Sequence, residues 1–177
     1  DEVGVFALVG SSTMKEERYA DNLPFFRTSE KVFESSEPIY YPDDEVTLRL
    51  ISYYPYQEEG VNMGESTMSV AVETDQNLSA GYFCSDFLVA SQNLQSAPKG
   101  AIALQLKIAL VGKEGEELQG ILDADPKLSV CGFYTKAIYD FQKETYSAFS
   151  NEKSITPAGK WEIQGDRLSG KEVILIP

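Results

Sequence analysis

The sequence has 177 residues, of which 42% are hydrophobic, so it can bury a core and is not a wholly disordered chain. Its net charge of −13 would repel a polyanion, and no cluster of Lys and Arg offsets that charge, so we expect no nucleic-acid partner. Histidine is absent, which excludes Ser-His-Asp and Cys-His catalysis and imidazole-ligated zinc.

The first part of the chain predicts a buried strand, then a loop, then an aromatic segment with a turn. Every residue of Val3–Val9 (VGVFALV) is apolar, so both faces of a strand would be apolar here. This favours a strand that is buried on both faces. The polar residues Ser11–Asn22 predict a loop with room for one helical turn. Leu23–Glu34 carries three phenylalanines around a turn at Thr28–Glu30.

Residues Glu45–Ser52 alternate with a period of two. Val46, Leu48 and Leu50 share one face, while Glu45, Thr47 and Arg49 share the other, which is typical of a half-buried strand. We therefore expect the leucine face to meet the core.

The clearest alternation lies in Ala101–Val111, where one predicted face carries Ile102, Leu104, Leu106, Ile108 and Leu110. The charged, glycine-containing residues Gly112–Glu117 then predict a hairpin loop, and Leu118–Leu122 the returning strand. Elsewhere, Ser85–Ala90 is the stretch that best suits a short helix.

Further strands are expected at Thr67–Glu73, Lys127–Ala137, Lys160–Gln164 and Glu172–Ile176. The total is about seven or eight short strands without long amphipathic helices. This pattern predicts an all-β, antiparallel sandwich or open barrel over residues 1–177 and argues against a βαβ fold.

Two cysteines are too few for a disulfide scaffold. Cys84 and Cys131 can form one bridge in an oxidising compartment, or they can be two buried small hydrophobic residues. The sequence does not decide between these arrangements.

Acidic residues offer little specific chemistry. Asp43-Asp44 and Asp123-Ala124-Asp125 can supply calcium ligands, but neither matches a complete calcium-binding loop, and aspartates also begin turns. A pair of carboxylates is the minimum for glycoside hydrolysis, yet 28 acidic residues make some pair inevitable. We expect no catalytic residue, metal or cofactor, and therefore no enzyme.

Tyrosines cluster at Tyr40-Tyr41 and at Tyr53-Tyr54. Exposed aromatic rings can stack on sugars, so a carbohydrate-binding module that uses these four residues is the alternative function. The competing interpretation is that one tyrosine of each pair packs into the core.

The last strand, Val173-Ile174-Leu175-Ile176, is entirely apolar and would aggregate if it were exposed. It is therefore either buried in the chain's own sheet or inserted into a neighbour's sheet, as in strand addition.

Several motifs together resemble a known family. They are VGVFA at Val3–Ala7, PIYYP at Pro38–Pro42, SYYPY at Ser52–Tyr56, TDQ at Thr74–Gln76, SDFLVA at Ser85–Ala90 and ILIP at Ile174–Pro177. In this order the series resembles the N-terminal domain of the Bacteroidetes fimbrillin-like proteins. It departs from their pattern at Leu106-Lys107-Ile108, where members often carry Phe-x-His.

The resemblance implies a transthyretin-like, Greek-key β-sandwich that forms the N-terminal half of a two-domain subunit. It further implies export as a lipoprotein to the outer membrane and a structural or adhesive role in a fimbria. The implied partners are other fimbrial subunits joined by strand exchange, and surface glycans or proteins of a host or bacterium.

No apolar run reaches the ~18–20 residues that span a bilayer. The resemblance implies membrane contact only through a lipid anchor, which this sequence lacks. We assign possible strand exchange to Val3 and Val5 and to the run Val173–Ile176. Since family members carry a strand before VGVFA, we also expect an open apolar groove beside the former neighbours of that strand.

Overall fold

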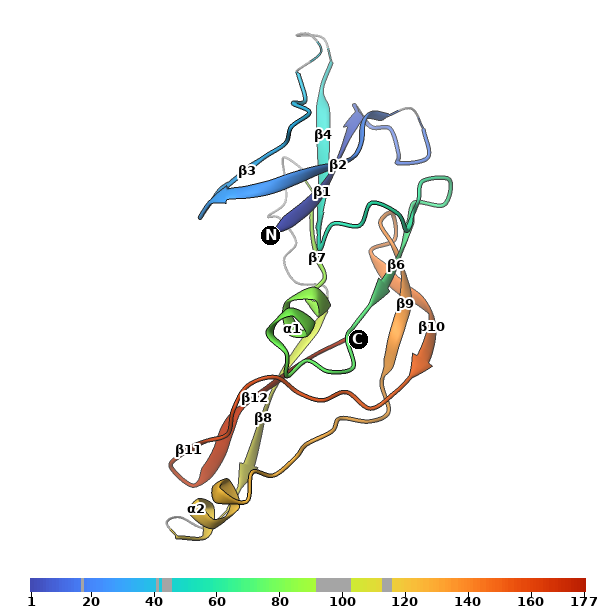
Figure 1. Ribbon diagram of the computed structural model, residues 1–177. Coiled ribbons are helices and arrows are strands. Elements are labelled where there is room, and N and C mark those ends of the chain that lie inside the picture. Colours follow the sequence, from blue (N-terminus) through green and yellow to red (C-terminus); the bar gives the residue numbers. More distant parts are fainter. Residues whose placement is uncertain (17, 41, 43–45, 92–102, 113–115) are drawn as a thin grey trace. The chain divides into compact units, whose positions relative to one another are not determined.

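The computed structural model describes residues 1–16, 18–40, 42, 46–91, 103–112 and 116–177 (Figure 1). These residues form antiparallel sheets with two short helices. The predicted fold class, an all-β sandwich, is therefore confirmed. The described residues contain twelve strands rather than seven or eight, because several are only two to four residues long. Asp43 and Asp44, predicted to form a turn, lie outside the described residues.

The chain divides into two compact units. The first contains Asp1–Val70, Asp86–Ile102 and Ile138–Ser147, and the second contains Ala71–Ser85, Ala103–Ala137 and Ala148–Pro177. A single domain over residues 1–177, with a second domain beyond it, stays a prediction.

The first unit contains a five-stranded sheet in the order β3-β2-β1-β4-β7 (Figure 1). Its strands are β1 (Glu2–Val9), β2 (Arg18–Ser29), β3 (Val32–Glu34), β4 (Leu48–Tyr54) and β7 (Leu88–Ser91). The apolar run VGVFALV occupies the central strand, as its two apolar faces require. β2 and β3 pair as a hairpin, and β2 runs through Thr28 and Ser29 of the predicted turn. Part of the predicted loop at Ser11–Asn22 is strand, because β2 begins at Arg18.

Aromatic rings fill the core of the first unit. Phe6 stacks on Tyr53 with ring centroids 5.9 Å apart, and Phe141 meets both rings edge-on. Tyr139 continues the cluster, since it lies 5.4 Å from Phe141 and 5.1 Å from Phe87. Burial raises the pKa of Tyr139 to about 12.

The predicted core face of β4 is wrong. Ile51 and Tyr53 are buried, whereas Leu48 is half-buried and Leu50 is exposed. The register pairs Ile51 with Phe6, and Tyr53 with Gly4, where a Cβ atom would overlap the tyrosine ring. The aromatic core therefore takes the Ile51–Tyr53 face, and the leucines point to the other side of the sheet.

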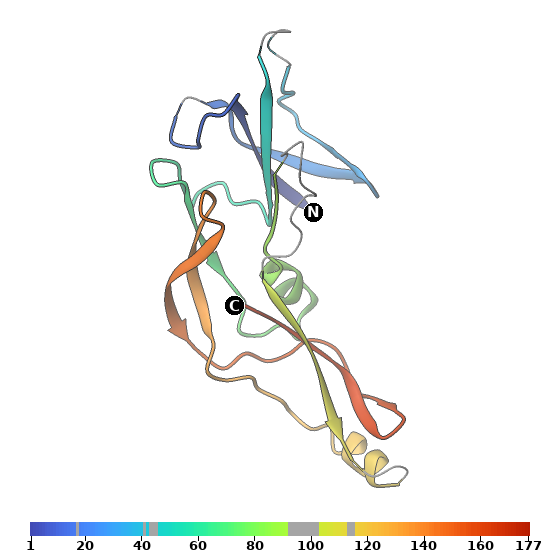
Figure 2. The same ribbon diagram turned by 180° about the vertical axis from the view of Figure 1, so that it is seen from behind.

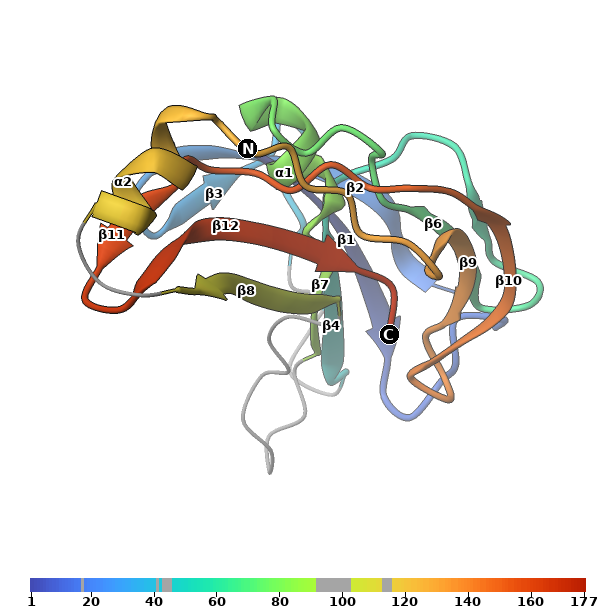
Figure 3. The ribbon, with the colours of Figure 1, turned by 90° about the horizontal axis from the view of Figure 1, so that it is seen from below.

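The second unit contains a three-stranded sheet in the order β11-β12-β8. The strands are β8 (Leu104–Val111), β11 (Glu162–Gln164) and β12 (Arg167–Leu175), and the helices are α1 (Ser79–Ser85) and α2 (Glu116–Asp123). Figure 2 shows α2 near one end of β8, and Figure 3 shows β8 and β12 side by side. Leu118 of α2 packs with Trp161 and Leu168 in a small buried cluster.

Both helices correct the sequence analysis. Leu118–Leu122 is helical and does not return as a strand, because Leu118, Ile121 and Leu122 then share the face that packs near Trp161. The predicted hairpin is therefore absent from the described residues, and β8 pairs with β12 instead. The helix predicted at Ser85–Ala90 does not form. The helix α1 ends at Ser85, and Leu88–Ser91 pairs with β4 as β7.

The remaining sheet has the order β10-β9-β6-β5. It consists of β5 (Val61–Asn62), β6 (Thr67–Ala71), β9 (Tyr134–Asp140) and β10 (Thr145–Glu152). Asp140 closes the β9–β10 turn, since its Oδ1 accepts hydrogen bonds from the backbone N–H groups of Gln142 and Lys143. In the described part of the chain, neither helix has the length and apolarity to cross a bilayer.

Candidate functional site

Strand β8 of the second unit exposes three leucine side chains. Leu104, Leu106 and Leu110, which the sequence pattern placed on one face of a strand, are 40%, 37% and 37% exposed. The pattern correctly predicts a strand with an apolar face, but among the described residues β8 pairs on one side alone, with β12. Its other side presents backbone N–H and C=O groups next to exposed leucines.

The backbone groups on that open side can be assigned from the neighbouring strand. The N–H of Ile174 donates to Gln76 Oε1, and Glu172 exchanges backbone hydrogen bonds with Ala158, so both residues point their polar groups away from β8. Gln105 lies opposite Ile174, and Lys107 lies opposite Glu172. In an antiparallel ladder these are non-hydrogen-bonded pairs, so the N–H and C=O groups of Gln105 and Lys107 point to the open side.

The side of β12 that faces away from β8 is covered by protein groups, although β11 itself pairs on one side alone within the described residues. Strand β11 pairs with β12 from Arg167 to Ser169, Ala158 bridges Glu172, and the side-chain amide of Gln76 bonds both backbone groups of Ile174 at 2.8 Å. Gln76 is completely buried. Within the described residues both sides of β12 are therefore covered, whereas β8 has an open side.

The run Val173–Ile176 is buried, and its first three residues lie in β12 and pair with β8. In this chain the run completes its own sheet, which is the first of the two arrangements considered above. Its insertion into a neighbour stays a prediction.

An apolar groove of about 850 Å³ lies on the first unit's sheet, on the face that carries the leucines of β4. Its walls include Val3, Val5, Phe25, Phe33, Leu48 and Leu50. Val3 and Val5, assigned above to strand exchange, are thus brought together with the leucines that the sequence placed in the core.

The four tyrosines do not form one platform. Tyr53 is 1% exposed, and its hydroxyl donates to Asn22 Oδ1 at 2.7 Å, so the expectation that it contacts a glycan is corrected. Tyr40 is 74% exposed, Tyr54 is half-buried, and Tyr41 lies outside the described residues. One tyrosine of the Tyr53-Tyr54 pair therefore packs inward, as the competing interpretation proposed.

The two cysteines form no disulfide, and Asp123 and Asp125 bind neighbouring side chains. Cys84 and Cys131 are exposed free thiols, so they are neither bridged nor buried. Asp125 forms an ion pair with Lys127, which lowers the pKa of its carboxyl, and Asp123 accepts a hydrogen bond from Gln119 at 2.7 Å. Within the described residues, no three Cys, Asp or Glu side chains come together as a metal site.

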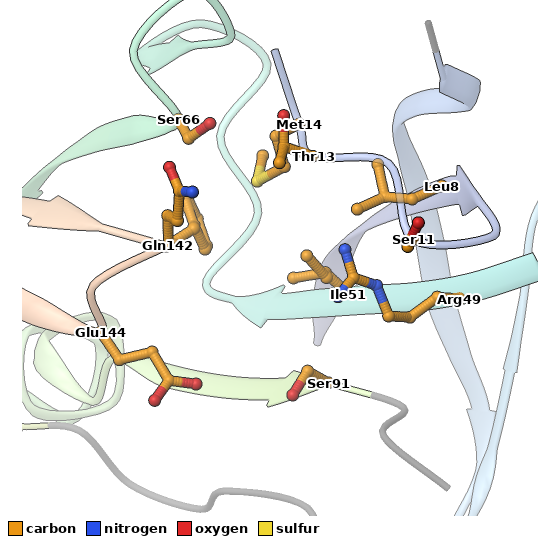
Figure 4. Close-up of a pocket in the computed structure, with 11 residues that line it drawn as sticks. Leu8, Ser11, Thr13, Met14, Arg49, Ile51, Ser66, Ser91, Gln142 and Glu144 are labelled. Atoms are coloured by element: carbon orange, nitrogen blue, oxygen red, sulfur yellow. The ribbon is translucent and has the colours of Figure 1, made fainter. Parts of the chain in front are cut away.

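A second, more polar pocket of about 260 Å³ lies in the first unit (Figure 4). Leu8, Ile51 and Phe141 supply apolar surface, and Arg49, Ser66, Ser91, Gln142 and Glu144 supply polar groups. Sequence reasoning missed this pocket, because its residues come from segments far apart in the chain and carry no local motif.

The comparisons with known proteins agree with the resemblance seen in the sequence. The model of the fimbrillin-like family matches residues 1–177, so the chain belongs to this family. A search of curated proteins found no match.

Two solved structures share the fold. One is the crystal structure of a "putative cell adhesion protein" from Bacteroides uniformis, with 19% identity, coverage of 99% of this chain and 68% of that chain, and a TM-score of 0.61. The other bears the same description and comes from Bacteroides ovatus, with 14% identity, coverage of 100% and 68%, and a TM-score of 0.61. At these identities the likeness shows the fold alone.

Proposed function

We propose that this chain is a structural or adhesive subunit of a fimbria or cell-surface adhesin, and that it joins neighbouring subunits by β-strand addition without catalysis. Its membership of the fimbrillin-like family supports assembly with other fimbrial subunits and display at the cell surface. The descriptions of the two similar structures support an adhesive role. An outer-membrane location through a lipid anchor belongs to the same proposal.

The observation that carries the proposal is the open edge of β8. Within the described residues, this edge combines unpaired backbone groups with exposed leucines, and such an edge is the surface to which an extended segment adds as another strand. Soluble proteins usually protect such an edge with charge, proline or a covering element. Here Lys107 is the one charged side chain on β8.

The pairing of β12 on both of its sides indicates which role this sheet plays. Inserting Val173–Ile176 into a neighbour would break the β8–β12 ladder and the two hydrogen bonds to Gln76. The sheet therefore acts as the acceptor, with β8 receiving a strand from another subunit. The groove around Val3 and Val5 offers a further apolar surface to a partner.

A proline on β8 tests this role. Lys107→Pro removes an N–H that points to the open side, and it leaves the hydrogen bonds between β8 and β12 in place. The matched control, Lys107→Ala, loses the same exposed ion pair with Glu172 and keeps the N–H.

The measurement is the incorporation of each variant into polymers sheared from cells that produce the whole subunit. We expect Lys107→Ala to be incorporated like the unmodified protein, and Lys107→Pro to be strongly depleted although it folds. Equal incorporation of the two variants would overturn assembly through β8.

A further inference from the structure

The polar pocket of the first unit has the features of a ligand site that is independent of strand addition. Its walls come from the loop after β1, from β4, from the β5–β6 turn and from the β9–β10 turn. Figure 4 shows Ser66 and Gln142 on one side, Arg49 and Ser11 on another, and Glu144 and Ser91 on a third. Polar groups therefore surround the pocket rather than gather at one end.

Two of these groups are buried and have no protein partner among the described residues. They are the Nε–H of Arg49 and the hydroxyl of Ser66, and Ser66 is 1% exposed. Arg49 is held in place by its other end, since Nη2 donates to the backbone oxygen of Ser12 at 2.7 Å. Buried polar groups are nearly always hydrogen-bonded in folded proteins, so both groups call for a bound partner, either an ordered water or a hydroxyl of a ligand.

The charges on the walls select the class of ligand. Arg49 and Glu144 are the two charged residues that line the pocket, and their formal charges cancel. A ligand hydroxyl suits both, because its oxygen accepts from the guanidinium and its hydrogen donates to the carboxylate. An anionic ligand would meet Glu144 and a net charge of −13.

The size and the apolar surface narrow the class further. A volume of about 260 Å³ is below the roughly 300–1,000 Å³ of pockets for drug-sized molecules, so a single ring fits better than an oligosaccharide. Leu8, Ile51 and Phe141 offer carbon surface to the C–H face of such a ring. We propose that this pocket binds one neutral sugar ring, with Arg49 and Ser66 donating to its hydroxyl oxygens.

The test is a titration of the folded chain with methyl pyranosides of neutral hexoses, followed by calorimetry or by NMR. Arg49→Lys keeps the charge and removes the Nε donor, and Ser66→Ala removes the hydroxyl. Each variant is expected to bind the preferred glycoside about tenfold more weakly, the loss of about one hydrogen bond to a ligand. Arg167→Lys, an exposed arginine of the second unit, is the matched control and should bind normally.

Thermal unfolding of each variant separates lost binding from lost folding, and Ser66→Ala keeps the test decisive if Arg49→Lys is unstable. Three results would overturn the proposal: no neutral glycoside binds, the methyl glycoside of sialic acid binds more tightly than every neutral one, or the folded variants bind as the unmodified protein does. None of these results bears on Lys107→Pro, so the sugar site and strand addition can fail separately.

Discussion

Gln76 and Ile174 are 98 positions apart in sequence and exchange two hydrogen bonds, each 2.8 Å long. The amide of Gln76 donates through Nε2 to the backbone oxygen of Ile174 and accepts through Oε1 from its N–H. A side-chain amide carries the same donor and acceptor as a peptide group, so Gln76 stands where the next strand would be. Gln76 covers the edge of β12 at Ile174 and ties the segment before α1 to the last strand.

Gln76→Met should therefore destabilise the chain strongly. Methionine fills a similar volume but leaves the N–H and C=O of Ile174 buried without partners, which we expect to cost about 2–4 kcal/mol of unfolding free energy. Chemical denaturation measures this loss. Gln119→Met, on the exposed surface of α2, is the control and should change stability by less than about 0.5 kcal/mol. A loss at Gln76 no larger than that at Gln119 would show that the edge is not closed by this amide.

Leu118→Ala should lower the stability of the fold, whereas Leu106→Ala should mainly lower assembly. Leu118→Ala empties a site that is 1% exposed beside Trp161 and Leu168, and should cost about 2–4 kcal/mol of unfolding free energy. Leu106→Ala, on the open face of β8, should cost less than about 1 kcal/mol in the isolated chain. The same Leu106 variant should lower incorporation into polymers, and normal incorporation would contradict a role for the exposed leucine face.

The stability of the β9–β10 turn should depend on pH through Asp140. Its carboxylate accepts hydrogen bonds from the Lys143 ammonium and from two backbone N–H groups, which lowers its pKa below the ordinary value of 3.8. A lowered carboxyl pKa stabilises the fold at pH values above 3.8, and this contribution is lost as the pH falls through the folded-state pKa.

We therefore expect Asp140→Asn to unfold more easily than the unmodified chain near neutral pH. The difference in unfolding free energy should shrink steadily in denaturant titrations carried out well below pH 3.8. A difference that is constant over this range would show that the charge of Asp140 does not stabilise the turn. Exposed Asp166→Asn, which loses an ion pair with Arg167, is the control, and its effect should be small throughout.

Sequence patterns identified most strands of the fold, because local alternation records which residues share a face. The run Val3–Val9 correctly indicated a strand buried on both faces. In β4, however, the pattern separated the two faces without showing that Ile51 and Tyr53 meet the aromatic core. In β8 it identified the leucine face, but alternation does not reveal whether the chain itself covers that face.

The errors and omissions have physical reasons as well. The helix α2 was missed although Leu118, Ile121 and Leu122 have helical spacing, since the charged and glycine-containing residues before it also suit a hairpin turn. Gln76 carries no periodic signal, because its partner lies in the last strand. The pocket at Arg49 and Ser66 is assembled from distant turns, and no local pattern records that proximity.

The asymmetry of the β11-β12-β8 sheet has a consequence for the geometry of any polymer built on it. The side of β12 away from β8 is covered by β11, Ala158 and Gln76, and β11 is only three residues long, so each copy of the sheet is expected to accept its incoming strand along β8. Contacts of this head-to-tail kind do not pair identical surfaces and need not close into a ring. The product expected from such a subunit is an unbranched filament whose two ends are chemically different.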